Sequence, residues 1–108
     1  MMRKFAIAAA ATCVALATAG ATRAQTAPTA ADIAAGRALS DRDCVACHRQ
    51  KFGTPDAIYT RPDRKVASLA ALRVQVARCN TELATQYFPD EEDQVTAYLN
   101  ATHYRFAR

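Results

Sequence analysis

The chain has 108 residues, 51% of them apolar, and a formal net charge of +4. This length suits one small domain and is too short for two. Removal of the first 24 residues, which include three basic side chains and no acidic one, leaves 84 residues and a net charge of +1. Because so small a charge attracts phosphates and anionic lipids only weakly, we expect no nucleic-acid partner.

The N-terminus has the features of an export signal. A positive region at residues 3–4 precedes an uncharged, alanine-rich run over residues 5–19, and small residues then allow cleavage after Ala21 or Ala24. The apolar run is short for a membrane-spanning helix. We therefore expect residues 1–24 to be a signal peptide and the mature protein to be periplasmic or otherwise exported, without a stable membrane span. An uncleaved anchor is the alternative.

A linker and a helix follow the predicted leader. Residues 25–29 are rich in Ala and Thr and are interpreted as the linker. Thr29, with Asp32 three residues later, has the pattern of a capping box. The helix that begins there is predicted to continue through Gly36 to about Ser40.

A Cys-x-x-Cys-His motif, Cys44-Val45-Ala46-Cys47-His48, comes directly after this helix. In an exported protein the motif is typical of covalent haem attachment, because two thiols can add to the porphyrin vinyl groups while the histidine binds the iron. Cys44 and Cys47 are therefore the predicted thioether residues of one haem c. His48 is the predicted proximal iron ligand.

Two further helices are predicted, and no convincing strand is found. Residues 49–66 contain one glycine and two prolines without sustained periodicity, so they are predicted to form a loop. Ser68 is the predicted N-cap of the second helix, and the third follows Pro89 with acidic residues in its first turn. The expected apolar faces are Leu69, Leu72, Val76 and Cys79, and then Val95, Tyr98, Leu99 and Thr102. The predicted fold class is all-α.

Together these features resemble a class I c-type cytochrome over residues 30–106. In that family a small residue on the first helix lets an aromatic residue of the last helix pack closely across it, and Gly36 and Tyr98 match these roles. The resemblance implies a small cytochrome c-like helical domain wrapped around one covalent haem. It also implies one-electron transfer between redox partner proteins.

The sequence departs from this family at the sixth iron position. The family usually supplies a methionine from the loop before the last helix, but both methionines of this chain lie in the predicted leader. Counting back from Tyr98 to the usual ligand position leads to Cys79, Asn80 and Thr81. Since methionine sulfur raises the potential of haem iron, its absence predicts a lower potential or an open site.

Cys79 and Asn80 are the candidate sixth ligands. Cys79, the cysteine left over by the motif, can bind ferric iron as a thiolate, although its place on an apolar helix face also suits an inert, buried thiol. Asn80 is similar to the displaceable asparagine of small cytochromes that bind oxygen or nitric oxide, although it also suits a helix C-cap. His103 would give bis-histidine ligation, but we expect it near the helix end at the surface. Water or an open position is the remaining alternative.

Several other residues have expected roles beside a haem. Pro55 can orient His48 through a neighbouring backbone carbonyl. The candidate donors to haem propionates, which also suit an ordinary solvated basic loop, are Tyr59, Arg61, Arg64 and Lys65.

Three functions are compatible with the sequence. The leading one is an electron carrier, and the second is a haem protein that binds oxygen or nitric oxide at a labile sixth position. In the third, Cys44, Cys47 and His48 bind zinc together with Cys79 or His103, or the cysteine pair acts as a dithiol. No acid–base pair or nucleophile array is evident, so we expect an electron carrier without independent enzyme activity.

Overall fold

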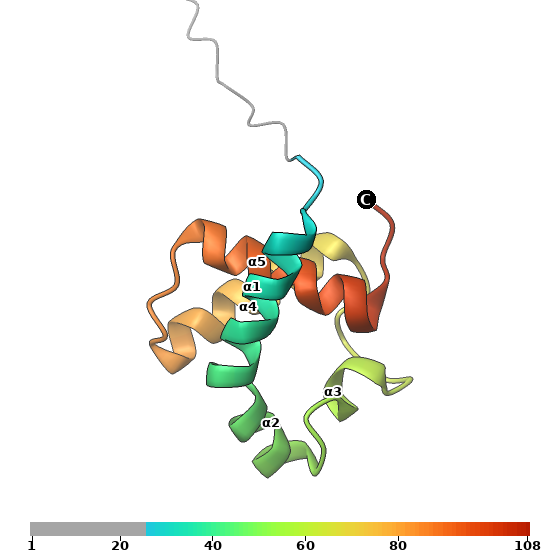
Figure 1. Cartoon of the computed structure of the whole chain (residues 1–108). Helices are drawn as coiled ribbons and strands as arrows, with labels where there is room; N and C mark the ends of the chain where they lie inside the picture. Colours follow the sequence, from blue (N-terminus) through green and yellow to red (C-terminus); the bar gives the residue numbers. More distant parts are fainter. Residues whose placement is uncertain (1–25) are drawn as a thin grey trace, which may run out of the picture.

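The computed structural model describes residues 26–108, and every regular element within them is helical. These elements are α1 (Ala30–Asp43), α2 (Val45–Phe52), α3 (Ala57–Thr60), α4 (Leu69–Leu83), α5 (Pro89–Leu99) and a π-helical turn, η1 (Asn100–Tyr104). The described residues form an all-α globule (Figure 1), which confirms the predicted fold class at that level. The predicted signal peptide, residues 1–24, lies outside the described residues.

Helices α1 and α4 begin at the capping residues that the sequence predicts. Thr29 Oγ1 accepts a hydrogen bond from the backbone N–H of Asp32 at 3.2 Å, and the Asp32 carboxylate accepts one from the Thr29 N–H at 2.8 Å. Ser68 Oγ accepts one from the Ala71 N–H at 3.1 Å. These bonds satisfy N–H groups of the first turn that have no intrahelical partner, and such a cap typically contributes about 1 kcal/mol.

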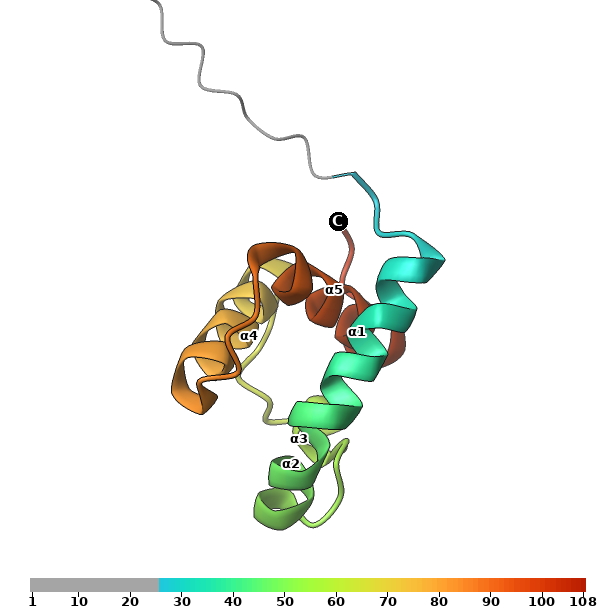
Figure 2. The same cartoon turned by 60° about the vertical axis from the view of Figure 1, so that its left-hand side comes forward.

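Gly36 allows α1 and α5 to cross at close range. It is buried, and a Cβ atom at this position would overlap the backbone carbonyl of Gln94 and lie 3.0 Å from the Cβ of Tyr98. A backbone carbonyl inside a helix cannot move aside as a flexible side chain can. The predicted close approach of Gly36 to Tyr98 is therefore confirmed, with Gln94 as a still nearer neighbour. Figure 2 shows α1 crossing α5.

The apolar core is formed by residues of α1, α3, α4 and α5 together with Tyr104 of the C-terminal turn. Leu72 is the most deeply buried large side chain, with 1% of its surface exposed. The buried members of the core are Leu39, Tyr59, Leu72, Val76, Val95, Leu99 and Tyr104. Helix α4 packs mainly against α5, so its other side is left to face the α2–α3 segment.

The predicted loop over residues 49–66 is wrong at residues 49–52 and 57–60. Residues 45–52 form α2 and residues 57–60 form α3. Gly53 ends α2 with a φ of 83°, so the glycine terminates a helix rather than preventing one. Helix α2 has no fully buried residue and only about two turns, which explains why no helical periodicity is visible in its sequence.

The end of the last helix also differs from the predicted pattern. Thr102, expected on the buried face, is exposed, whereas Tyr104 is buried. The cause is η1, in which the Arg105 N–H bonds to the Asn100 carbonyl at 2.8 Å, five residues back instead of four. This wider turn rotates the side chains that follow it.

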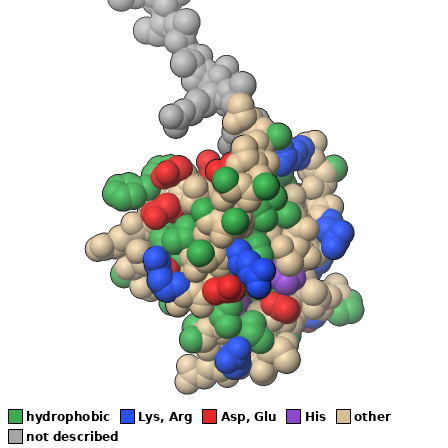
Figure 3. Space-filling model, in the orientation of Figure 1, with side chains coloured by type: hydrophobic (Ala, Val, Ile, Leu, Met, Phe, Trp, Pro, Cys, Tyr) green, Lys and Arg blue, Asp and Glu red, His purple; other side chains and the backbone are tan. Residues whose placement is uncertain are grey.

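Acidic, basic and apolar side chains are interspersed on the face of the molecule in Figure 3. Among residues 26–108, no helix combines the length and the apolar character needed to cross a bilayer.

Replacing Gly36 by alanine is expected to destabilise the protein. The added methyl group would overlap the Gln94 backbone, and overpacking of this kind typically costs about 1–3 kcal/mol, which exceeds the helix-propensity gain of alanine. The free energy of unfolding, measured with denaturant, tests this. Ala34→Ser, at an exposed position of α1, is the control and should change stability by less than about 0.5 kcal/mol. Equal stability of Gly36→Ala and the wild type would contradict the close crossing.

Candidate functional site

A cavity of about 310 Å³ lies between the α2–α3 segment and α4. Its volume lies at the lower end of the range of about 300–1,000 Å³ that is usual for ligand and cofactor sites. Most residues that the sequence singled out line this one cavity: Cys44, Cys47, His48, Tyr59, Arg61, Arg64, Lys65, Cys79 and Asn80. Pro55 and His103 do not line it.

The remaining cavity wall is largely apolar. Ile58 and Val66 come from the α3 region, Leu72 and Val76 from α4, and Val95 and Leu99 from α5. An apolar wall with a few convergent polar groups is the usual lining of a cofactor site. Two thiols, an adjacent imidazole and apolar walls are also the donor set and surroundings that a covalent haem requires, so the residues present fit that group.

Cys44 stands at the junction of α1 and α2. It is both the C-cap of α1, with its N–H bonded to the Ser40 carbonyl at 2.9 Å, and the N-cap of α2. Cys44 and Cys47 are half-buried and free of disulfide bonds. Burial raises the pKa of the Cys44 thiol, with further contributions from Cys79 and the Asp43 carboxylate. A raised pKa is the opposite of what a reactive dithiol needs, so the dithiol alternative gains no support.

His48 projects from α2 and bonds to a residue that follows it in the chain. Its Nδ1 lies 2.8 Å from the hydroxyl of Tyr59. Burial lowers the pKa of His48, and a hydrogen bond to the Pro55 backbone, which raises this pKa, offsets the shift only in part. The ring is therefore neutral near pH 7, which is the form that binds metals. Because Nδ1 is engaged, Nε2 is the nitrogen left for a metal.

Tyr59 and Arg64 are not the solvated loop residues that the sequence allowed. Tyr59 is only 7% exposed, and burial raises the pKa of its phenol well above the ordinary value. Arg64 donates to the Tyr59 carbonyl at 2.9 Å, and its guanidinium lies 5.0 Å from the ring centroid of Tyr104. By contrast, Arg61 and Lys65 are exposed at the rim of the cavity.

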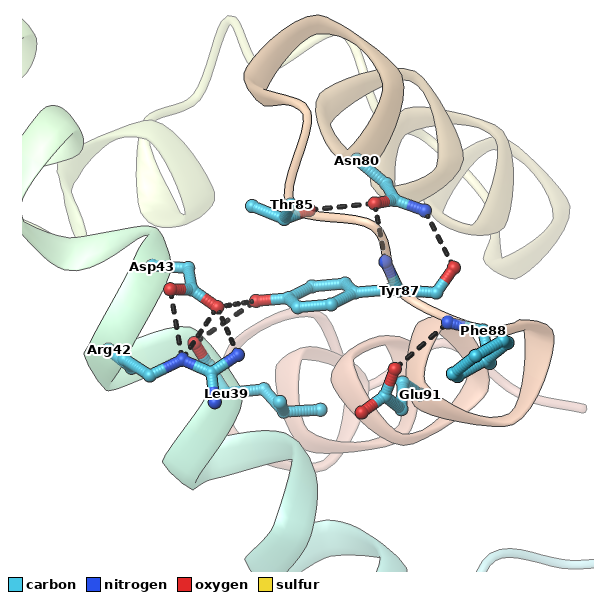
Figure 4. Close-up of polar contacts among 8 residues, drawn as sticks. All are labelled: Leu39, Arg42, Asp43, Asn80, Thr85, Tyr87, Phe88 and Glu91. Carbon is cyan, nitrogen blue, oxygen red and sulfur yellow. Dashed lines mark hydrogen bonds and ion pairs between the residues drawn. The ribbon is translucent and has the colours of Figure 1, made fainter.

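Asn80 uses its whole side-chain amide within the protein, and Figure 4 shows its bonds to Thr85 and Tyr87. Its Oδ1 accepts hydrogen bonds from the Thr85 hydroxyl at 2.7 Å and the Tyr87 N–H at 2.9 Å. Its Nδ2 donates to the Tyr87 carbonyl at 3.1 Å and to the Glu92 carboxylate at 2.7 Å. Two accepted and two donated bonds are the full capacity of a carboxamide.

The expectation that Asn80 is a helix C-cap is wrong. Helix α4 continues past Asn80 to Leu83, and Ala84 is the C-cap, with a φ of 52°. Gln86, two residues later, has a φ of 61°. Left-handed backbone at two residues other than glycine is unfavourable, so it persists only where other contacts impose it. The Asn80 hydrogen bonds supply those contacts.

Tyr87 links this turn to the helix that leads into the cysteine motif (Figure 4). Its hydroxyl donates to the Asp43 carboxylate and also contacts the Leu39 carbonyl, while Arg42 holds Asp43 by a bond of 2.7 Å. Asp43 immediately precedes Cys44. No local sequence signal indicates the Tyr87–Asp43 contact, because the two residues are 44 positions apart.

Cys79 lies on the α4 wall of the cavity, facing the motif. The side-chain amide of Gln75 donates to its Sγ at 3.3 Å. Gln75 also lines the cavity and is not among the sequence-derived candidates. Its spacing of four residues from Cys79 on one helix was the available signal, since such residues are surface neighbours.

His103 lies behind Tyr59 rather than at the surface. Its side chain is 11% exposed, its ring stacks on Tyr59 with centroids 4.8 Å apart, and its Nε2 is 3.7 Å from the Asp56 carboxylate. The expected surface position is therefore wrong, because η1 turns this residue inward. In the part of the chain that the structure describes, no three His, Cys, Asp or Glu residues are grouped closely enough to hold a metal ion. The zinc alternative thus gains no support.

Comparisons with protein-family models, curated proteins and solved structures found no match to this chain. The functional interpretation of the cavity therefore depends on its own residues and contacts.

Tyr87→Phe is expected to lower the free energy of unfolding by about 1–2 kcal/mol, because it removes a hydrogen bond to a charged carboxylate. Hydrogen bonds from Arg42 and then from Tyr87 lower the pKa of Asp43 below its ordinary value of 3.8. The stabilisation by Asp43 is thus fully present above that pH and is lost as the pH falls through the lowered pKa.

Two measurements check this prediction. In an NMR titration, the pKa of Asp43 should be higher in Tyr87→Phe than in the wild type. The stability difference between the two proteins should narrow as the pH falls below about 3.8. Tyr98→Phe is the control, since no hydrogen bond from its hydroxyl is found within residues 26–108. An unchanged Asp43 pKa in Tyr87→Phe would contradict the hydrogen bond between Tyr87 and Asp43.

Proposed function

We propose that this chain is an exported c-type cytochrome with one covalent haem, which transfers single electrons between redox partner proteins. The observation that carries the proposal is the shared cavity. Cys44, Cys47 and His48 line it from one side, Cys79 lines it from the other, and apolar residues fill the wall between them. Cys44, Cys47, His48 and the apolar wall are the groups that the resemblance to class I c-type cytochromes requires, whereas Cys79 lies where that family usually places its methionine.

Each group of the cavity has a distinct role in this proposal. Cys44 and Cys47 would form the thioethers, and His48 would bind the iron through Nε2. The bound haem would supply a one-electron ferric/ferrous couple. The apolar wall would exclude water from the iron, and the exposed cations of Arg61 and Lys65 at the rim suit the haem carboxylates.

The packing of the helices also supports a bound cofactor. Helix α4 packs mainly on α5 and faces the α2–α3 segment across the cavity. A domain of this size buries little apolar surface by itself and often needs a staple or a cofactor. A haem tethered at Cys44 and Cys47 would provide both, since it would join the two sides through contacts absent from the unfolded chain.

Among the candidate sixth ligands, we favour Cys79. Asn80 would have to give up its bonds to Thr85 and Tyr87 before its oxygen became available, which would release the turn that these bonds hold. The Cys79 thiol accepts one bond, from Gln75, and lines the cavity. A thiolate at this position would leave the potential lower than a methionine would.

Binding of oxygen or nitric oxide is the second candidate function. Its support is the lack of a methionine outside the predicted leader, together with the full engagement of the Asn80 amide. If Cys79 does not bind the iron, the sixth position holds water or is open. Rapid uptake of carbon monoxide and nitric oxide by the ferrous protein would then favour gas binding. Resistance to both gases would favour the electron carrier.

Covalent haem attachment is the first test. The full chain is produced in a host with c-type cytochrome maturation, and the intact mass of the exported protein is measured together with its pyridine haemochrome spectrum. We expect the mass to exceed that of the polypeptide by one haem. Because the thioethers need both thiols, Cys44→Ser with Cys47→Ser should abolish the increase. A wild-type mass equal to that of the amino acids alone would overturn the proposal.

The identity of the sixth ligand is tested separately. Cys79→Ala is expected to change the ferric absorption and electron paramagnetic resonance spectra, because loss of the thiolate alters the ligand field. Thr81→Ala, at an exposed position on the same helix, is the matched control and should leave both spectra unchanged. Identical ferric spectra for Cys79→Ala and the wild type would exclude Cys79 as the ligand.

A further inference from the structure

The hydroxyl of Tyr59 is directed at His48 rather than at the rim of the cavity. The two side chains meet at 2.8 Å, between the phenol oxygen and Nδ1, and their rings are arranged edge to face with centroids 5.3 Å apart. Tyr59 is 7% exposed, so little water competes for this bond. The sequence suggested Tyr59 only as a donor to haem propionates.

Contacts from η1 and from the loop after α3 hold Tyr59 in place. His103 stacks on it with centroids 4.8 Å apart, and Tyr104 meets it edge-on at 5.8 Å. Arg64 donates to the Tyr59 backbone carbonyl at 2.9 Å. The hydroxyl therefore has a defined position before any cofactor binds, which is the condition for orienting a ligand precisely enough to tune it.

We infer that Tyr59 is the positioning residue of the proximal iron ligand, holding the His48 ring through Nδ1 so that Nε2 is left for the metal. This inference rests on the proposed function. With iron on Nε2, Nδ1 would carry the ring proton and donate a hydrogen bond to the Tyr59 oxygen. Such a second contact fixes the tautomer and the ring orientation of a metal-binding histidine and raises its basicity. A more basic ligand stabilises ferric over ferrous iron.

The position of Tyr59 beside His48 depends on the turn η1. His103 and Tyr104 belong to η1, which follows α5 directly. The π-helical turn that buries Tyr104 also brings His103 against Tyr59. The support of the proximal histidine thus comes from the far end of the chain.

The test is the ferric/ferrous midpoint potential of the haem-loaded protein. Tyr59→Phe keeps the ring but removes the hydroxyl, and we expect the potential to rise. A tenfold change in the ferric/ferrous equilibrium corresponds to about 59 mV for one electron. In a ferrous Cys79→Ala background, which leaves the iron five-coordinate so that the resonance Raman iron–histidine stretch can be observed, Tyr59→Phe should move this stretch to lower frequency, because the less basic imidazole binds more weakly. Tyr104→Phe is the control. It removes a hydroxyl from the same aromatic cluster, but this hydroxyl makes no hydrogen bond to His48.

The outcomes separate this inference from the proposed function. If haem is attached in both proteins and Tyr59→Phe changes neither the potential nor the stretch, Tyr59 does not position His48, but the cytochrome proposal stands. If the wild type carries no haem, the proposed function itself fails.

A measurement on the wild type covers the case in which Tyr59→Phe does not accumulate. NMR of the ferrous haem-loaded protein should then detect a slowly exchanging Nδ1 proton of His48 with a nuclear Overhauser effect to the Tyr59 ring. Fast exchange without that effect would overturn the inference.

Discussion

The close crossing of α1 and α5 at Gly36 is the constraint on which the rest of the structure depends. Helix α1 leads directly into Cys44 and α2, so the direction that it takes across α5 decides where the cysteine motif lies. Helix α5 leads directly into η1, whose aromatic residues pack around Tyr59. One contact between two backbones therefore positions both the motif and the cluster behind its histidine. Any side chain larger than hydrogen at Gly36 would separate these two elements.

Two tyrosines at the cavity link different segments of the chain by hydrogen bonds. Tyr87 joins the turn after α4 to Asp43, at the end of α1, and Tyr59 joins α3 to His48. Each bond links segments of the chain that lie on different elements, and each tyrosine lines the cavity. A helix that faces a cavity instead of a neighbour gains little from packing, so polar links of this kind hold the walls at a defined separation. In the proposed cytochrome, the cofactor would add the apolar contacts that these links alone do not supply.

The α4 wall illustrates how neighbouring residues take different roles. Cys79 and Asn80 are adjacent in the chain, and both line the cavity, but the four hydrogen bonds of Asn80 hold the turn between α4 and α5. That turn contains two left-handed residues that are not glycine, so its geometry depends on those bonds. A residue that holds a strained turn is a poor exchangeable ligand, because ligand exchange would also release the turn. The Cys79 thiol, by contrast, accepts a hydrogen bond only from Gln75 of the same helix, so breaking that bond would release no turn.

The sequence by itself determined the features that depend on local chemistry. The capping residues Thr29 and Ser68, the helical class and the Cys-x-x-Cys-His motif are all read from neighbouring residues, since a cap or a motif acts within a few positions. Only the tertiary structure decided that α2 and α3 are helical and that η1 turns His103 inward. It also decided that the Tyr59 hydroxyl bonds to His48, and that the Asn80 amide bonds to the turn between α4 and α5. These outcomes depend on partners distant in the chain, and a hydrogen bond or a buried contact between such partners leaves no periodic trace in the sequence.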